Sequence, residues 1–82
     1  MKTLIKVRRK HINEGRPSEA ESCPVALAIE DSGFRFPDVG GSGLIFVDDK
    51  KYKEPRSVTR FIAKFDEGKK VKPFNFFLVE KQ

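Results

Sequence analysis

The chain has 82 residues, of which 38% are hydrophobic and 35% charged, and its formal net charge is +5. This length allows a single domain over residues 1–82, and the apolar content is too high for a disordered chain. No apolar run approaches the roughly 18 residues that cross a membrane, and the start lacks the apolar segment of a secretory signal. One cysteine and one histidine exclude a disulfide framework and a structural zinc site. We therefore expect a protein of a reducing compartment, without membrane segment, metal or cofactor.

Charge is unevenly distributed along the chain. Residues 1–16 carry a net charge of +5, residues 17–34 carry −4, residues 35–55 are neutral and residues 56–82 carry +4. If the two basic ends meet in the fold, they form one positive face that attracts phosphate-bearing ligands or acidic proteins. The alternative is ordinary surface charge that keeps a small domain in solution.

In chain order, the first expected strand covers residues 3–8, where side chains alternate between apolar and polar. One helical turn over residues 9–14 follows. A polar loop then leads to a helix over residues 24–32, with Pro24 as its first residue and Gly33 as its end. This helix is apolar on nearly every side, which indicates burial.

The middle of the chain is expected to form two short strands. The first covers residues 34–36 and is ended or interrupted by Pro37, and the second covers residues 44–47. Between them, the glycine-rich residues 40–43 are expected to form a flexible loop. Residues 48–51 are interpreted as a polar turn or a frayed end of the second strand, and a resumption of strand pairing at Tyr52 is left open.

The clearest helix in the chain begins at Pro55 and stops at Gly68. Its apolar side chains recur at helical spacing on one stripe, formed by Val58, Phe61, Ile62 and Phe65. The last strand, residues 74–79, has apolar residues in both alternating sets. We therefore place it centrally in the sheet and expect it to be buried on both faces.

These elements predict a single α+β domain in the order β-α-β-β-α-β, with a four-stranded, mostly antiparallel sheet and two main helices. The expected core consists of Ile5, Val7, Val25, Ala28, Ile29, Phe34, Phe46, Val58, Phe61, Ile62, Phe65, Phe76 and Leu78. RNA-recognition domains share this element order and carry surface aromatics. Their K/R-G-F/Y-G/A-F-V-x-F/Y run is absent here, so that interpretation has little support.

Two motifs make the chain resemble a group of small, uncharacterised proteins encoded by phages and prophages. The first is H-I-x-x-G followed by C-P-V-A-L-A-I, at residues 11–15 and 23–29, and the second is F-I-x-x-F-D-x-G, at residues 61–68. The resemblance covers most of the chain. It implies a phage origin, the cytoplasm of a host cell and, by analogy with other small phage proteins, a role against bacterial defence.

Basic side chains are the first candidate binding site. On the long helix, Arg56, Arg60 and Lys64 recur every fourth residue, so they are expected to form a ridge opposite the apolar stripe. Arg8 and Arg9 end the first strand, and guanidinium groups bind phosphate through two parallel hydrogen bonds. The alternative for both groups is a solvated outer face.

The glycine-rich loop is the second candidate, because successive glycines expose backbone N–H groups to an anion. We include Ser42 of this loop among the expected ligand-binding residues. The loop is not a P-loop, since the lysine of that motif is missing. The alternative is a flexible connection between strands, which would also suit a lid.

The remaining reactive residues leave their roles open. Cys23 is either a thiolate at a helix N-terminus or a small buried residue, and the apolar run after it favours burial. His11 either donates to a phosphate or caps a local turn. A catalytic Cys23/His11 pair lacks an orienting group. Asp48-Asp49 and Asp66-Glu67 are not expected to share a metal, because adjacent strand residues point to opposite faces.

We therefore expect a non-enzymatic protein that binds a phosphate-bearing ligand, either a nucleotide or a nucleic acid. The expected ligand-binding residues are Arg8, Arg9, Ser42, Arg56, Arg60 and Lys64. The alternative is an inhibitor that docks on an acidic surface of a host protein. An enzyme is the least supported class, because no nucleophile, base and orienting group can be assembled. A homo-oligomer is left open, since chains of this size often dimerise to build a pocket.

Overall fold

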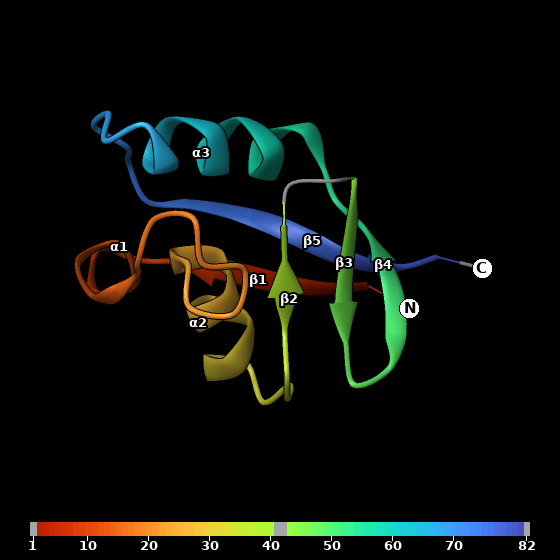
Figure 1. Cartoon of the computed structure of the whole chain (residues 1–82). Coiled ribbons are helices and arrows are strands. Elements are labelled where there is room, and N and C mark those ends of the chain that lie inside the picture. Colours follow the sequence, from red (N-terminus) through yellow and green to blue (C-terminus); the bar gives the residue numbers. More distant parts are fainter. Residues whose placement is uncertain (1, 41–42, 82) are drawn as a thin grey trace.

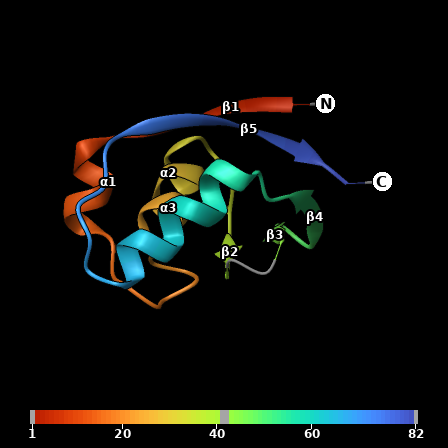
Figure 2. The same ribbon diagram turned by 90° about the horizontal axis from the view of Figure 1, so that it is seen from above.

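The computed structural model describes residues 2–40 and 43–81. Its elements are β1 (Lys2–Val7), α1 (Arg9–Glu14), α2 (Pro24–Asp31), β2 (Asp38–Val39), β3 (Leu44–Val47), β4 (Lys50–Lys53), α3 (Arg56–Asp66) and β5 (Phe74–Glu80). Within these residues the five strands form one antiparallel sheet in the order β1-β5-β4-β3-β2. The sheet is curled, and α2 and α3 lie on the same side of it (Figure 1, Figure 2). The chain is therefore a small α+β domain, as expected.

The two ends of the chain form the longest strand pair of the sheet. β1 pairs with β5 over six residues, from Lys2 opposite Val79 to Val7 opposite Phe74. β5 pairs with β4 over only two residues. A long β1–β5 ribbon and a smaller β2–β3–β4 unit thus meet at one corner, where Figure 1 shows the sheet bending. The expected interior position of the last strand is confirmed.

The core lies between the inner face of this sheet and the two longer helices. α2 buries five of its eight residues, and Pro24 is its first residue, as expected. Gly33 follows its end with φ of +98°, a left-handed conformation that glycine adopts without strain. α3 turns Val58, Phe61 and Ile62 inward. The apolar stripe predicted for the long helix is therefore confirmed.

The strand expected at residues 34–36 is wrong. Phe36 has φ of +53°, which breaks the extended conformation, and the strand that follows begins only at Asp38. Pro37 separates the two and is buried. The proline therefore precedes strand β2 rather than ending a strand before it.

The fifth strand comes from the segment interpreted as a polar turn or a frayed end. Asp48 and Asp49 have φ of +50° and +66°, so they form the two-residue turn whose twist matches that of a hairpin. β4 then pairs with β3 from Lys50 opposite Val47. The sheet has five strands rather than four because this hairpin is complete.

Two expectations about burial are also wrong. Phe46 is 40% exposed, because Ile45 and Val47 are the residues of β3 that face inward. Phe77 is 46% exposed, so β5 is buried on one face only. Phe34 and Phe65 are partly buried and pack against the core. Residues of the core that the sequence did not predict are Cys23, Ala26, Val39, Ile45, Val47 and Tyr52.

Candidate functional site

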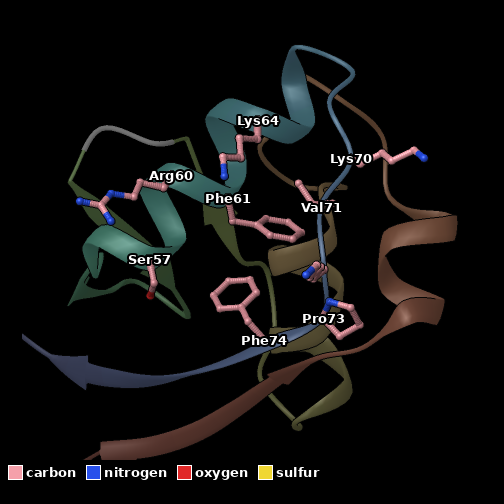
Figure 3. A pocket seen from close by; sticks show the side chains of 9 residues that line it. Ser57, Arg60, Phe61, Lys64, Lys70, Val71, Pro73 and Phe74 are labelled. Carbon is pink, nitrogen blue, oxygen red and sulfur yellow. The ribbon is translucent and has the colours of Figure 1, made fainter.

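A cleft between α3 and the segment that leads into β5 brings together cationic and aromatic side chains (Figure 3). Its volume is about 440 Å³. We call it the α3–β5 cleft, and it is lined by Ser57, Arg60, Phe61, Lys64, Lys70, Val71, Lys72, Pro73 and Phe74. A helix supplies one wall and an extended connector supplies the other, so the fold of the whole C-terminal third positions this site.

The floor of the cleft is aromatic. The ring centroids of Phe61 and Phe74 are 4.8 Å apart, and Figure 3 shows the two rings facing each other. Phe61 also stacks on Phe65 at 6.1 Å, and Phe74 stacks on Phe76 at 5.9 Å. Because Phe61 and Phe76 are buried in the core, this floor is held in place by the packing of the domain.

The rim of the cleft is cationic. Arg60, Lys64, Lys70 and Lys72 line it, and no aspartate or glutamate does. All four side chains are exposed, and within the part of the chain that the structure describes none of them forms a salt bridge. Figure 3 shows Arg60 and Lys70 extending outward at opposite ends of the cleft, with Lys64 between them. The rim therefore carries positive charge that no neighbouring acid compensates.

Helix geometry explains which cations of α3 reach the cleft. Each step of four residues advances about 40° around a helix, so Arg56 lies about 80° around the helix from Lys64. Lys64 lies beside Phe61 at the border of the apolar stripe, Arg60 lies next to it, and Arg56 lies farthest around the helix. The expected ridge of three cations is thus divided, with two in the cleft lining and one outside it.

The N-terminal cations do not join Arg60 and Lys64. Arg8 lines a different pocket, of about 570 Å³, together with Lys6 and Lys10. Arg9 is exposed at the first position of α1. Of the cations expected to form a single anion site, only Arg60 and Lys64 line the same cleft.

Two further points concern one expected residue that the structure does not describe and two lysines that the sequence analysis left out. Ser42 lies outside the described residues. Lys70 and Lys72 were not among the expected ligand-binding residues, although they line the α3–β5 cleft. Lys70 and Lys72 are two residues apart in the segment before Pro73, and an extended segment places every second side chain on the same side. This spacing is the one sequence signal that would have grouped the two lysines.

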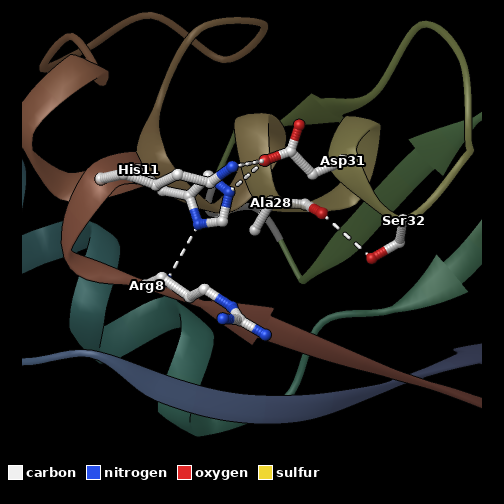
Figure 4. Close-up of polar contacts among 6 residues, drawn as sticks. Arg8, His11, Ala28, Asp31 and Ser32 are labelled. Carbon is white, nitrogen blue, oxygen red and sulfur yellow. Dashed lines mark hydrogen bonds and ion pairs between the residues drawn. The ribbon is translucent and has the colours of Figure 1, made fainter.

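The pocket beside Arg8 contains a buried histidine, His11, which is 3% exposed. Its Nδ1 accepts a hydrogen bond from the backbone N–H of Arg8 at 2.9 Å, so the proton sits on Nε2. Nε2 donates to Oδ2 of Asp31 at 2.6 Å (Figure 4). Both ring nitrogens are therefore engaged within the fold. His11 joins α1 to the end of α2 and has no nitrogen left for a substrate.

Cys23 precedes the first residue of α2 and is 3% exposed. Burial raises the pKa of its thiol, and this outweighs the backbone N–H groups of Val25 and Ala26, which act in the opposite direction. The interpretation of Cys23 as a small buried residue is therefore the one that the structure supports. An activated thiolate at the helix N-terminus is not present.

The acidic residues named as metal candidates serve other contacts. Asp66 accepts a hydrogen bond from the backbone N–H of Ser18 at 2.8 Å, and Glu67 pairs with Lys69 at 2.9 Å. Across residues 2–40 and 43–81, no group of three or more His, Cys, Asp or Glu is placed to hold a metal ion. No helix in the same residues is long and apolar enough to cross a bilayer.

In comparisons with known proteins, no protein family, no curated protein and no solved structure matches this chain.

Proposed function

We propose that this protein binds a phosphate-bearing ligand with a flat aromatic part, such as a nucleotide, in the α3–β5 cleft. The observation that carries the proposal is the combination of four uncompensated cations with an aromatic floor. Arginine and lysine bind phosphate through charge-assisted hydrogen bonds, and arginine does so with two donors in parallel. An aromatic ring system packs favourably against exposed parts of phenylalanine rings. The two halves of a nucleotide thus match the two halves of the cleft.

The size and chemistry of the cleft favour binding without turnover. Small-molecule sites typically enclose about 300–1,000 Å³, and this cleft of about 440 Å³ falls in that range. Its lining contains neither histidine nor carboxylate, so it lacks a general base beside the Ser57 hydroxyl. Away from the cleft, His11 is fully hydrogen-bonded and Cys23 is buried. These observations support a binding protein rather than an enzyme.

Calorimetric titration of the purified protein with AMP, ATP, a cyclic dinucleotide and inorganic phosphate tests this proposal. Arg60→Gln and Lys64→Gln should each weaken nucleotide binding about tenfold, the loss expected for one charge-assisted hydrogen bond. Arg56→Gln is the matched control, because it removes the same charge from the same helix outside the cleft. Its affinity should stay within about twofold of the unmodified protein, since only screened long-range charge is lost.

Two outcomes would contradict the proposal. If neither the nucleotides nor inorganic phosphate bind, the cleft is not an anion site. If Arg56→Gln weakens binding as much as Arg60→Gln, the effect is one of general charge and the cleft has no special part in it.

An inhibitor that docks on an acidic host protein is the second candidate, and the same four cations favour it. The most exposed aromatic residue, Phe36, does not favour this candidate. Phe36 is 81% exposed, but the pocket beside it is lined by two acids, Glu21 and Glu30, against one cation, Arg35, so this place does not favour an acidic partner. Salt-sensitive co-purification of one host protein, lost in Arg60→Gln and without bound nucleotide, would select the inhibitor.

A further inference from the structure

The face of the sheet that points away from α2 and α3 carries a second group of basic and apolar side chains. Buried Ile5 lies opposite Phe76 and fixes the inner side of the β1–β5 ribbon, so Leu4 and Phe77, the next pair, point outward. Buried Ile45 lies opposite Tyr52 in the same way. We call the result the outer sheet face, formed by Lys2, Leu4, Lys6, Phe46, Lys51, Lys53 and Phe77.

This face holds three of the four large hydrophobic residues that are exposed in the described chain. Leu4 is 42% exposed, and its partner across the strand pair, Phe77, is 46% exposed. Phe46 stands on the other part of the sheet. Apolar groups gathered on one face of a small protein commonly mark an interaction surface.

Lysines alternate with these apolar groups. Lys2 and Lys6 flank Leu4 along β1, and the Nζ of Lys2 lies 4.6 Å from the centroid of the Phe77 ring. Lys51 and Lys53 face outward from β4. In the described part of the chain none of the four forms a salt bridge, and the acid that register places on this face, Asp38, lies on the edge strand β2. The face is thus positive with aromatic rings inside the positive region.

A hollow of about 480 Å³ adjoins Phe77. It exists because β4 and β5 pair at only two residues and then diverge. Phe77 and Val79 of β5 line it together with Lys53, Glu54 and Pro55, so one lysine and one carboxylate border the hollow. A planar group could therefore enter the sheet surface beside Phe77 with a lysine at its edge.

We propose that the outer sheet face binds single-stranded nucleic acid, with bases on Phe77 and Phe46 and phosphates on the four lysines. Aromatic rings on an open sheet stack only on unpaired bases, and each base stacked in this way contributes substantially to affinity. A second copy of the chain is a poor occupant, because face-to-face contact would oppose four lysines to four lysines. The site is distinct from the α3–β5 cleft, since none of the cleft cations lies on it.

Fluorescence anisotropy with labelled oligonucleotides tests the proposal. Single strands of dT and of rU, each of about twelve nucleotides, should bind more tightly than a duplex of the same length. Phe77→Leu keeps an apolar side chain but removes the ring, and it should weaken single-strand binding about tenfold. Phe36→Leu is the control, because it removes the ring of a phenylalanine that is even more exposed, at 81%, and lies away from the outer sheet face. It should leave binding unchanged.

The lysines have a separate readout. The logarithm of the binding constant for a single strand falls linearly with the logarithm of the salt concentration. Each phosphate contact contributes about 0.7 to the steepness of this line. The double variant Lys51→Gln/Lys53→Gln should therefore reduce the slope by about 1.4. Arg16→Gln/Lys69→Gln removes the same net charge outside the outer sheet face and should leave the slope unchanged.

Circular dichroism first verifies that each variant is folded. The proposal is overturned if duplex binds as well as single strands, or if Phe77→Leu has no effect. It is also overturned if the protein binds vesicles of anionic lipid but no oligonucleotide. Loss of oligonucleotide binding in Arg60→Gln, with Phe77→Leu unaffected, would assign the nucleic acid to the cleft instead. Failure of the cleft to bind nucleotides leaves this proposal standing.

Discussion

Single residues in the N-terminal motif act on the fold rather than on a ligand. His11 satisfies the backbone N–H of Arg8 and holds Asp31, so it closes the start of α1 and fixes the end of α2. A carboxylate near the C-terminal end of a helix opposes the helix dipole. The contacts of Asp31 with His11 and with Lys10, at 3.0 Å, offset that repulsion.

Asp31 makes the stability of the protein depend on pH at the acid side. Hydrogen bonds from His11 and then from Lys10 lower the pKa of the Asp31 carboxyl. A lowered pKa means that the folded state favours the carboxylate, so this contribution to the free energy of unfolding is fully present above the ordinary pKa of about 3.9. It is lost as the pH falls through the lowered value. Asp31→Asn should therefore reduce stability at pH 7, and the difference from the unmodified protein should narrow below pH 4.

Urea unfolding at pH 7 and at pH 3 measures this difference. Asp38→Asn, a change at an exposed residue of β2, serves as the control and should show no comparable narrowing. If Asp31→Asn lowers the free energy of unfolding by the same amount at both pH values, the charge of Asp31 does not contribute to stability.

Among single residues, sequence patterns located part of the candidate site. Arg60 and Lys64 stood out because they recur on a helix with clear periodicity, and both line the cleft. Lys70 and Lys72 follow the helix in a connector without periodicity, so no pattern assigned them to the same place. Phe77 was predicted to be buried because both alternating sets of its strand are apolar, and alternation alone then cannot tell the inner face from the outer.

The junction of α1 and α2 shows how two elements constrain one residue. A Cβ on Gly15 would lie 2.5 Å from Cδ of Pro24, which is closer than such atoms come in folded proteins. Gly15→Ala should therefore destabilise the protein by about 1–3 kcal/mol, the usual cost of an overpacked contact. Thermal or urea unfolding measures the loss.

Gly40→Ala is the matched control for this prediction. The nearest atom to its Cβ is the Asp38 side chain at 4.0 Å, and its backbone needs no left-handed conformation. This change should be neutral or slightly stabilising, because alanine restricts the unfolded chain. Equal stability of Gly15→Ala and Gly40→Ala would show that Pro24 moves aside at little cost.

Element boundaries were predictable where capping chemistry marks them and not elsewhere. Pro24 and Gly33 bound α2 as the sequence indicates. Residues 48–51 were predicted only as a polar turn or a frayed strand end, and not as a tight hairpin. A left-handed conformation costs a residue other than glycine about 1–2 kcal/mol, and hairpins usually signal it with glycine. The tertiary pairing of β3 with β4 supports this conformation, and no local pattern reports that pairing.

In the whole molecule, strand pairing brings the two ends of the chain together but leaves their cations in separate clusters. β1 and β5 are neighbours, so N-terminal lysines stand beside the C-terminal strand on the outer sheet face. The cations of α3 form a different cluster, in the cleft. The motifs that suggest a phage relative include His11, Gly15 and Pro24, whose contacts are structural. Phage origin, a role against host defence and a homo-oligomer stay predictions.

The clusters of uncompensated cations also determine how salt changes the stability of the domain. The net charge is +5, and the cleft and the outer sheet face each concentrate positive side chains. Within a cluster the cations repel one another in the folded state, and NaCl screens this repulsion over about 10 Å at 0.1 M. The melting temperature should therefore rise by several degrees between low salt and 0.5 M NaCl.

Phosphate at the same ionic strength should raise the melting temperature further, because an anion that binds only the folded state stabilises it. Phosphate also stabilises proteins by exclusion from their surface. The decisive quantity is therefore the part of the phosphate-dependent rise in melting temperature that is lost in Arg60→Gln/Lys64→Gln. That part reports occupancy of the cleft. Differential scanning calorimetry measures both effects. A melting temperature that falls with NaCl would show that attraction within ion pairs outweighs repulsion among the clustered cations, and would remove the electrostatic basis for both proposed sites.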